Sequence, residues 1–155
     1  MFREMRRTDR QLTEEETMQI LQDNQYGVLS TVSMDGYPYG VPMSYAYTNG
    51  KIYFHGTNAN GLKKENIEHS SKACFTVVGN TEVLPSKFST KYESIIAFGQ
   101  IKISEDTQDV LRKLIQKYSP EYLENGEKYI STAMKNVTVY EFEIESVTGK
   151  ARKNG

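Results

Sequence analysis

The chain has 155 residues, a length typical of one domain, and 37% of its residues are hydrophobic, a set that includes eleven tyrosines. Nineteen Lys and Arg against twenty Asp and Glu give a net charge of −1, which argues against a dedicated nucleic-acid or anionic-membrane binder. No apolar run approaches the roughly 18–20 residues that span a bilayer, and the first residues lack the apolar segment of a secretory signal. One cysteine excludes an internal disulfide and a multi-cysteine metal site. We expect a soluble, cytoplasmic protein with a single domain over residues 1–155, whose lean core favours further burial in an oligomer.

The first expected helix follows an arginine-rich start. Four arginines and two carboxylates give residues 1–10 a local charge of +2. Thr13 and Glu16 then form a capping box, in which each side chain can bond the other residue's backbone N–H. Apolar residues at Met18 and Leu21 give the segment one semi-buried side. These features predict a helix over residues 13–24.

Six segments are expected as strands because they are rich in β-branched residues or alternate in polarity. They cover residues 26–34, 37–47, 51–55, 72–78, 91–103 and 137–147. Turn signals at residues 35–36 (Asp-Gly) and 49–50 (Asn-Gly) join the first three as hairpins.

Two strands carry information about their place in the sheet. Pro38 and Pro42 cannot donate to a ladder, so the strand over 37–47 lies at an edge or is broken by a bulge. The strand over 91–103 has apolar residues on both sides, such as Ile95 on one and Phe98 on the other. Both of its faces should therefore be covered.

Further helices are expected between the strands. Asn60 is a candidate cap for a short helix ending at Ile67, an apolar stripe marks the clearest helix at 107–118, and a weaker helical piece runs on through Tyr129. Residues 79–90 are expected as a loop. Six strands, short hairpins, two or three helices and no alternation of single strands with helices predict a mainly β fold, an antiparallel barrel or sandwich.

The segment at residues 56–63, GTNANGLK, approaches a phosphate-binding P-loop but departs from it. Leu62 stands where the lysine is required, and no hydroxyl residue follows Lys63, so nucleotide hydrolysis is rejected. Glycine-rich backbone at a helix start followed by Lys63 and Lys64 can still bind an anion. A solvated turn with two surface lysines remains the alternative.

The remaining candidates have plain structural explanations. Cys74 lies within an expected strand, which favours a buried structural thiol over a nucleophile. The spacing of His55, His69 and Cys74 matches no familiar metal site, so no metal is expected. His69 is expected to be solvated, whereas His55 ends a strand where the chain turns into the anion-binding segment. The arginine-rich start lacks the aromatic residues that interleave a nucleic-acid-binding arm.

Six segments, taken together, resemble one protein family. They are MRRTDRQL at 5–12, GYPYGVP at 36–42, IYFHG at 52–56, GLKK at 61–64, YESIIAFG at 92–99 and VTGK at 147–150. Their order and spacing are similar to those of the nitroimidazole-resistance (Nim-type) proteins, which belong to the pyridoxamine 5′-phosphate oxidase-like FMN-binding split barrels. The resemblance covers nearly the whole chain.

The resemblance implies a six-stranded antiparallel split β-barrel of Greek-key topology that forms a homodimer, with FMN in two symmetric clefts at the interface. It implies cofactor-binding roles for twelve residues: Lys63 and Lys64 at the phosphate, the backbone of Val41, Pro42, Met43 and Ser44 along the isoalloxazine ring, His55, Gly56 and Thr57 beside the ribityl chain and ring, and Tyr92, Ser94 and Ile95 from the opposite protomer. His55 is the leading candidate for a catalytic side chain. Glu93 departs from the pattern, because many relatives have a basic residue there.

The activity implied by the resemblance is that of an FMN-dependent reductase. Its acceptor would be a nitroaromatic, 5-nitroimidazole-like or other small planar molecule, with NAD(P)H or another reductant as donor. Three alternatives stay open. The chain binds flavin without turnover as a carrier or redox-responsive protein; it oxidises pyridoxamine 5′-phosphate, for which we find no convincing second basic set; or it binds haem through His55 or His69.

Overall fold

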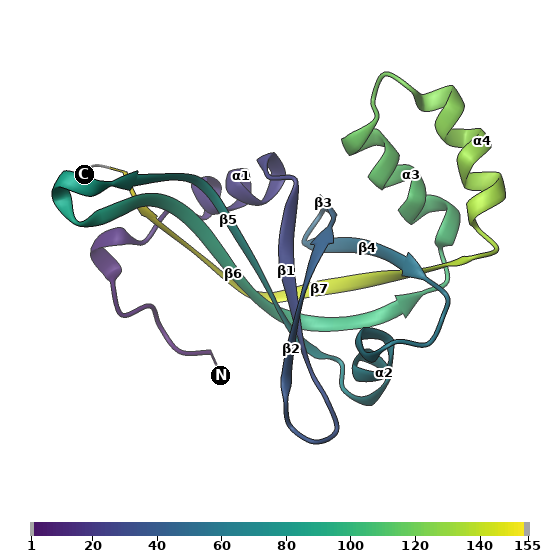
Figure 1. Cartoon of the computed structure of the whole chain (residues 1–155), viewed down its shortest axis with the longest axis horizontal. Helices are drawn as coiled ribbons and strands as arrows, with labels where there is room; N and C mark the ends of the chain where they lie inside the picture. The colour runs from purple at the N-terminus through teal and green to yellow at the C-terminus, as the bar shows by residue number, and fades with distance from the viewer. Residues whose placement is uncertain (1, 154–155) are drawn as a thin grey trace.

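Seven antiparallel strands form one curved sheet in the computed structural model, which describes residues 2–153 (Figure 1). The strands are β1 (Tyr26–Val32), β2 (Pro38–Ser44), β3 (Ala46–Thr48), β4 (Lys51–Thr57), β5 (Lys72–Leu84), β6 (Ser89–Ser104) and β7 (Val137–Arg152). Their order across the sheet is β2-β1-β5-β6-β7-β4-β3. The mainly β, antiparallel fold is confirmed, whereas the predicted number of six strands is wrong.

The additional strand arises because Tyr45 divides the expected strand over 37–47 into β2 and β3. β2 lies at one edge of the sheet and β3 at the opposite edge, although only this residue separates them. The sheet therefore curls until both of its edges meet the same short stretch of chain. The edge position of β2 agrees with the prediction from Pro38 and Pro42, since neither has an N–H for a second neighbouring strand.

Four α-helices accompany the sheet, one more than the upper end of the predicted range of two or three. They are α1 (Glu14–Asp23), α2 (Leu62–His69), α3 (Thr107–Tyr118) and α4 (Leu123–Ala133), with short 3-10 turns at Thr8–Arg10 and Pro85–Lys87. α4 is regular because Ile130 is buried in a cluster with Val110, Leu111 and Leu114 of α3. Among the described residues, no helix is long and apolar enough to cross a membrane.

The two predicted helix caps differ in outcome. The Thr13 hydroxyl accepts a hydrogen bond from the Glu16 N–H at 3.2 Å, so the cap of α1 is confirmed. The cap of α2 is Gly61 and not Asn60, because the Gly61 carbonyl accepts the first helical bond, from the Glu65 N–H.

The expected loop at residues 79–90 is a continuation of the sheet. β5 and β6 stay paired out to Leu84 and Ser89, and the tight turn between them places Phe88 in the left-handed region at φ 49°. Gly79 and Pro85 resemble loop signals, but Gly79 precedes a register shift and Pro85 opens the turn itself. The result is a long hairpin arm, defined here as residues 79–93, which extends away from the rest of the sheet (Figure 1).

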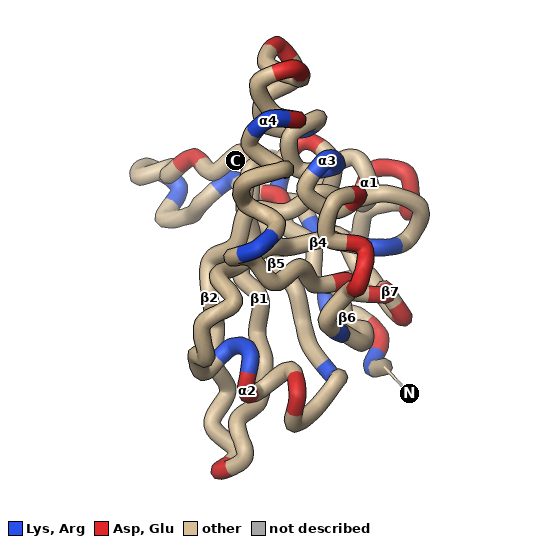
Figure 2. Tube along the Cα trace, turned by 90° about the vertical axis from the view of Figure 1, so that its right-hand side faces the viewer, with Lys and Arg blue, Asp and Glu red and all other residues tan. Residues whose placement is uncertain are grey.

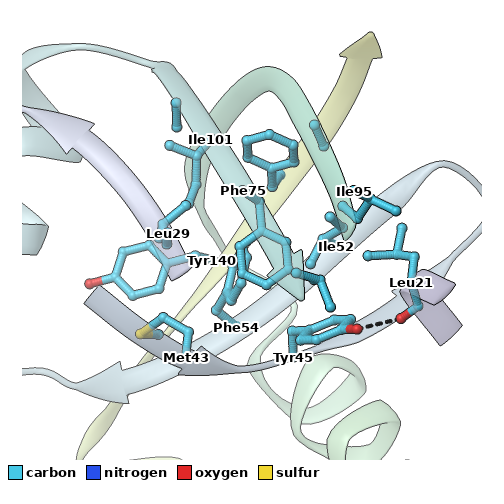
Figure 3. Close-up of a cluster of buried hydrophobic side chains, with 14 of the residues drawn as sticks. Leu21, Leu29, Met43, Tyr45, Ile52, Phe54, Phe75, Ile95, Ile101 and Tyr140 are labelled. Carbon is cyan, nitrogen blue, oxygen red and sulfur yellow. Dashed lines mark hydrogen bonds between the residues drawn. The ribbon is translucent and has the colours of Figure 1, made fainter. Parts of the chain in front are cut away.

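The main core lies inside the curve of the sheet (Figure 3). Phe75 of β5 contacts the rings of Tyr45 and Phe54 edge to face, with centroids 4.9 and 5.1 Å away. The Tyr45 hydroxyl donates to the carbonyl of Leu21 in α1, so a buried polar atom is satisfied. These contacts attach the bend at Tyr45 to both the sheet and the first helix.

Only one face of β6 is covered within the chain. Ile95 and Ala97 are fully buried, whereas Ile96 and Phe98 on the other face are 41% and 40% exposed. The expectation that both faces are covered is therefore wrong for the single chain. The Phe2 ring stacks on Phe98 at 5.2 Å but leaves much of that face open.

Candidate functional site

The end of β4, the first turn of α2 and the last residues of β2 meet around the ammonium group of Lys63. Its Nζ atom lies 3.6 Å from the sulfur of Met43 on β2 and 5.5 Å from the centre of the Tyr140 ring. Tyr140 comes from β7, where it pairs with Phe54 of β4. In Figure 2 the basic start of α2 is the blue stretch beside its label. Residues from β2, β4 and β7 thus surround the one cation of α2.

Gly56 makes room for this cation. A Cβ atom at Gly56 would stand 2.9 Å from the Lys63 Nζ atom, and the nearest other group is the Tyr140 ring. A larger residue would displace the ammonium group from its place against β4. Gly56, the first residue of the glycine-rich segment 56–63, therefore has a steric reason to be there.

Lys63 is a half-buried cation without a carboxylate partner. None of the ion pairs formed among residues 2–153 includes it. Burial lowers the pKa of the Lys63 ammonium below its ordinary value, because the charged form loses hydration. A thioether and the face of an aromatic ring compensate a desolvated ammonium only weakly, so the remaining donors favour an anion.

His55 lies beside this cation and has an unsatisfied nitrogen. Its Nδ1 atom is buried and has no hydrogen-bond partner among the described residues. Burial lowers the pKa of His55, and the charge of Lys63 lowers it further. The imidazole is therefore neutral near pH 7 and can offer one nitrogen to a bound molecule.

The other predicted residues of this region lie on the same two strands and helix. The Lys64 Nζ atom is 3.4 Å from the carbonyl oxygen of Asn58, and Thr57 is exposed at the end of β4. On β2, Met43 is buried, Val41 is half-buried, and Pro42 and Ser44 are exposed. β2 has β1 as its neighbour on one side, which leaves the backbone groups of the other side available to a ligand.

Tyr92, Ser94 and Ile95 are not brought to Lys63 within one chain. The ring of Tyr140 lies near Lys63, and Tyr140 pairs with Ile103 of β6. Ile95 is eight residues along β6 from Ile103, a path of roughly 26 Å at about 3.3 Å per residue. The Ile95 side chain is fully buried in the core. Glu93 also belongs to the arm, where its carboxylate accepts from the Asn80 amide at 2.7 Å.

Two residues that form or support the site were not predicted from the sequence. Tyr140 supplies the ring beneath Lys63, but its alternating pattern indicated only a strand. Asn66 of α2 donates to the Thr31 hydroxyl of β1 at 3.1 Å, a buried bond that fixes the helix against the sheet. An asparagine in an otherwise polar helix gives no signal of such a contact.

The candidates set aside from sequence lie elsewhere. Cys74 is half-buried rather than fully buried, and burial raises the pKa of its thiol, which disfavours the nucleophilic thiolate. His69 is exposed, as predicted, near the end of α2. In the part of the chain that the structure describes, no group of three His, Cys, Asp or Glu residues is arranged to hold a metal ion.

Comparison with known proteins relates this fold to one family. Residues 13–151 match the family model described as pyridoxamine 5′-phosphate oxidase. No curated protein matches the chain.

Solved structures share the fold at low sequence identity. A protein assigned to 5-nitroimidazole antibiotic resistance from Bacteroides thetaiotaomicron is 20% identical, with a TM-score of 0.75 over 91% of this chain and 86% of its own. A flavocytochrome from Azotobacter vinelandii is also 20% identical, with a TM-score of 0.78 over 97% and 73% of the two chains. An FAD- and haem-binding protein from Mycobacterium smegmatis is 17% identical, with a TM-score of 0.76 over 94% and 74%.

The proximity of His55 and Lys63 gives a measurable pH effect. In Lys63→Met the repulsive charge is absent, so we expect the pKa of His55 to rise relative to the wild type. Because the chain has only two histidines, an NMR titration of the imidazole resonances, assigned with His69→Gln, measures this value. An unchanged His55 titration in Lys63→Met would contradict the contact.

Proposed function

Because the chain belongs to the pyridoxamine 5′-phosphate oxidase family, we propose that it binds FMN in a single split-barrel domain and reduces a nitroaromatic or other small planar acceptor. The observation that carries the proposal is Lys63, a half-buried cation without a carboxylate partner among the described residues, beside the unsatisfied Nδ1 atom of His55. The family to which the chain belongs and the polar groups of Lys63 and His55 both support a flavin with a phosphate group as the ligand.

The residues present fit the terminal phosphate of FMN. Lys63 would give the phosphate a charge-assisted hydrogen bond. The backbone N–H groups in the first turn of α2 lie at the positive end of the helix dipole and would favour the same negative charge. Lys64 lies in the same turn. The open edge of β2 over residues 41–44 would offer backbone groups to the rim of a flat ring, with Met43 next to Lys63.

The proposal names FMN because Lys63, which forms no ion pair with any described residue, suits a single phosphate monoester at the start of α2. One of the similar proteins is described as binding FAD and haem, and another is described as a flavocytochrome. A titration should therefore compare FMN with FAD. When bound, the flavin supplies the hydride and electron transfer. The chain's own contribution is to hold the phosphate with Lys63, to keep His55 neutral beside the site, and to leave one face accessible to a small acceptor.

We further propose that the working unit is a homodimer. Within one chain, Tyr92, Ser94 and Ile95 are remote from Lys63, and the arm and adjoining part of β6 from a partner would supply these residues near it. The exposed apolar side chains of the arm and β6 support this arrangement, with Val83 70% and Phe88 96% exposed.

We expect light scattering of the purified chain to give twice its monomer mass. A monomer that retains flavin would contradict the shared site.

Flavin affinity tests the role of Lys63. The variant Lys63→Met keeps the aliphatic stem and loses the charge, so we expect a loss of about 1.5–3 kcal/mol of binding free energy, or roughly 10- to 150-fold in the Kd for FMN. Fluorescence quenching of added FMN measures this. The matched control is Lys128→Met on the exposed side of α4, which should bind like the wild type. Equal affinity of the Lys63 variant and the control would refute the phosphate assignment.

Anaerobic spectroscopy separates a reductase from a flavin binder. We expect NADPH or NADH to bleach the flavin bands of the loaded protein and a 5-nitroimidazole to restore them. A protein that holds flavin but is not reoxidised by the nitro compound would be a binder without this activity. A purified protein with haem absorption and no affinity for either flavin would contradict the whole proposal.

A further inference from the structure

The crossing at Tyr45 leaves both backbone polar groups of a buried residue outside the regular ladder. Tyr45 is 0% exposed and stands between β2 and β3. The β1–β2 register ends at the pair Tyr26 and Ser44, so the next pair would be Gln25 and Tyr45. Gln25 and Tyr45 are not paired in the sheet, and a side-chain hydroxyl lies between the Tyr45 N–H and the Gln25 carbonyl.

The hydroxyl belongs to Tyr118, in the last turn of α3. It accepts a hydrogen bond from the Tyr45 N–H at 2.9 Å, and its oxygen lies 2.5 Å from the Gln25 carbonyl, to which it donates. The side chain thereby replaces one rung of the ladder at the point where the sheet opens. An unsatisfied Tyr45 N–H at this buried position would be costly.

Lys117 satisfies the other backbone group of Tyr45. Its Nζ atom donates to the Tyr45 carbonyl at 2.8 Å and lies 3.6 Å from the centre of the Tyr45 ring. None of the ion pairs among residues 2–153 includes Lys117. Burial lowers the pKa of this lysine to about 8. Two consecutive side chains of one helix therefore hold the N–H, the carbonyl and the ring of one residue, an arrangement we name the α3 clamp.

Tyr45, the residue that the α3 clamp holds, directly follows the stretch of β2 proposed to bind flavin, residues 41–44. Met43 of β2 precedes Tyr45 by two positions in the chain, and its sulfur contacts Lys63. α3 itself is anchored independently, because Val110, Leu111 and Leu114 pack against Ala46 and Val139 of β3 and β7. The helix thus has a firm base from which to fix the end of β2.

We propose that the α3 clamp, made by Lys117 and Tyr118, is a positioning device that sets where the flavin-binding stretch of β2 lies relative to Lys63. This inference rests on the proposed flavin binding. Lys117 and Tyr118 touch neither Lys63 nor the open edge of β2 and act through Tyr45. The helix α3, which contributes no residue to the predicted site, thereby gains a role in its geometry.

The test variant is Tyr118→Phe, which removes the hydroxyl and keeps the ring. We expect the Kd for FMN to rise about tenfold, the visible circular dichroism of bound flavin to change, and amide hydrogen exchange over residues 40–44 to speed up. Exchange in the paired centre of β5 and β6 should stay as in the wild type. The matched control is Tyr122→Phe, since Tyr122 is exposed and its hydroxyl has no hydrogen-bond partner among the described residues.

The outcomes distinguish a role of the α3 clamp in positioning β2 from a general contribution to the stability of the fold. A lower melting temperature with unchanged flavin affinity, unchanged spectrum and unchanged exchange over residues 40–44 overturns the inference. If Tyr118→Phe does not fold, Lys117→Met, which keeps the apolar stem, is judged by the same readouts. A wild-type chain that binds no flavin refutes the proposed function, and the exchange of residues 40–44 in the ligand-free variants then decides alone whether the clamp positions β2.

Discussion

A chain that leaves one edge of a sheet and joins the opposite edge through a single residue must satisfy that residue's backbone outside the ladder. Tyr45 meets this requirement with side chains from α3 for its N–H and carbonyl, and with a carbonyl of α1 for its hydroxyl. Buried polar groups without partners are strongly disfavoured, so these bonds decide where the sheet can curl. The curve in turn creates the core around Phe75 and brings the end of β2 toward α2.

Around Lys63 the opposite condition holds, because polar groups are buried without full compensation. The ammonium group has lost water and has a sulfur and a ring face as neighbours, and His55 has an unsatisfied nitrogen beside it. In a folded chain such groups are costly unless a ligand completes them. The contrast between the satisfied bend at Tyr45 and the incomplete site nearby is the physical basis for treating Lys63 as a binding residue rather than a surface lysine.

Local chemistry predicted several elements well. The Thr13 cap and the apolar stripe of α3 depend on neighbours within one helix, and both agree with the structure. Most of the arm, residues 79–90, is predicted as a loop because Gly79 and Pro85 resemble loop signals. Its pairing depends on cross-strand contacts with β6 and β7, which residue preferences do not encode. The same limit applies to the division of the expected strand over 37–47 into β2 and β3, since the Tyr45 backbone at the break is held by side chains of α3, a helix more than sixty residues later.

The sequence by itself determined the mainly β antiparallel class, the family resemblance, and the association of Gly61 with Lys63 at a helix start, because these depend on residues close together in the chain. Only the tertiary structure decided that Lys63 lacks a carboxylate among the described residues, that Tyr140 lies beneath it, and that Tyr92 is remote from it. Charge compensation and ring contacts depend on which strands become neighbours, and strand order follows from the global closure of the sheet. The −1 net charge of the whole chain thus conceals one desolvated cation whose significance only its surroundings reveal.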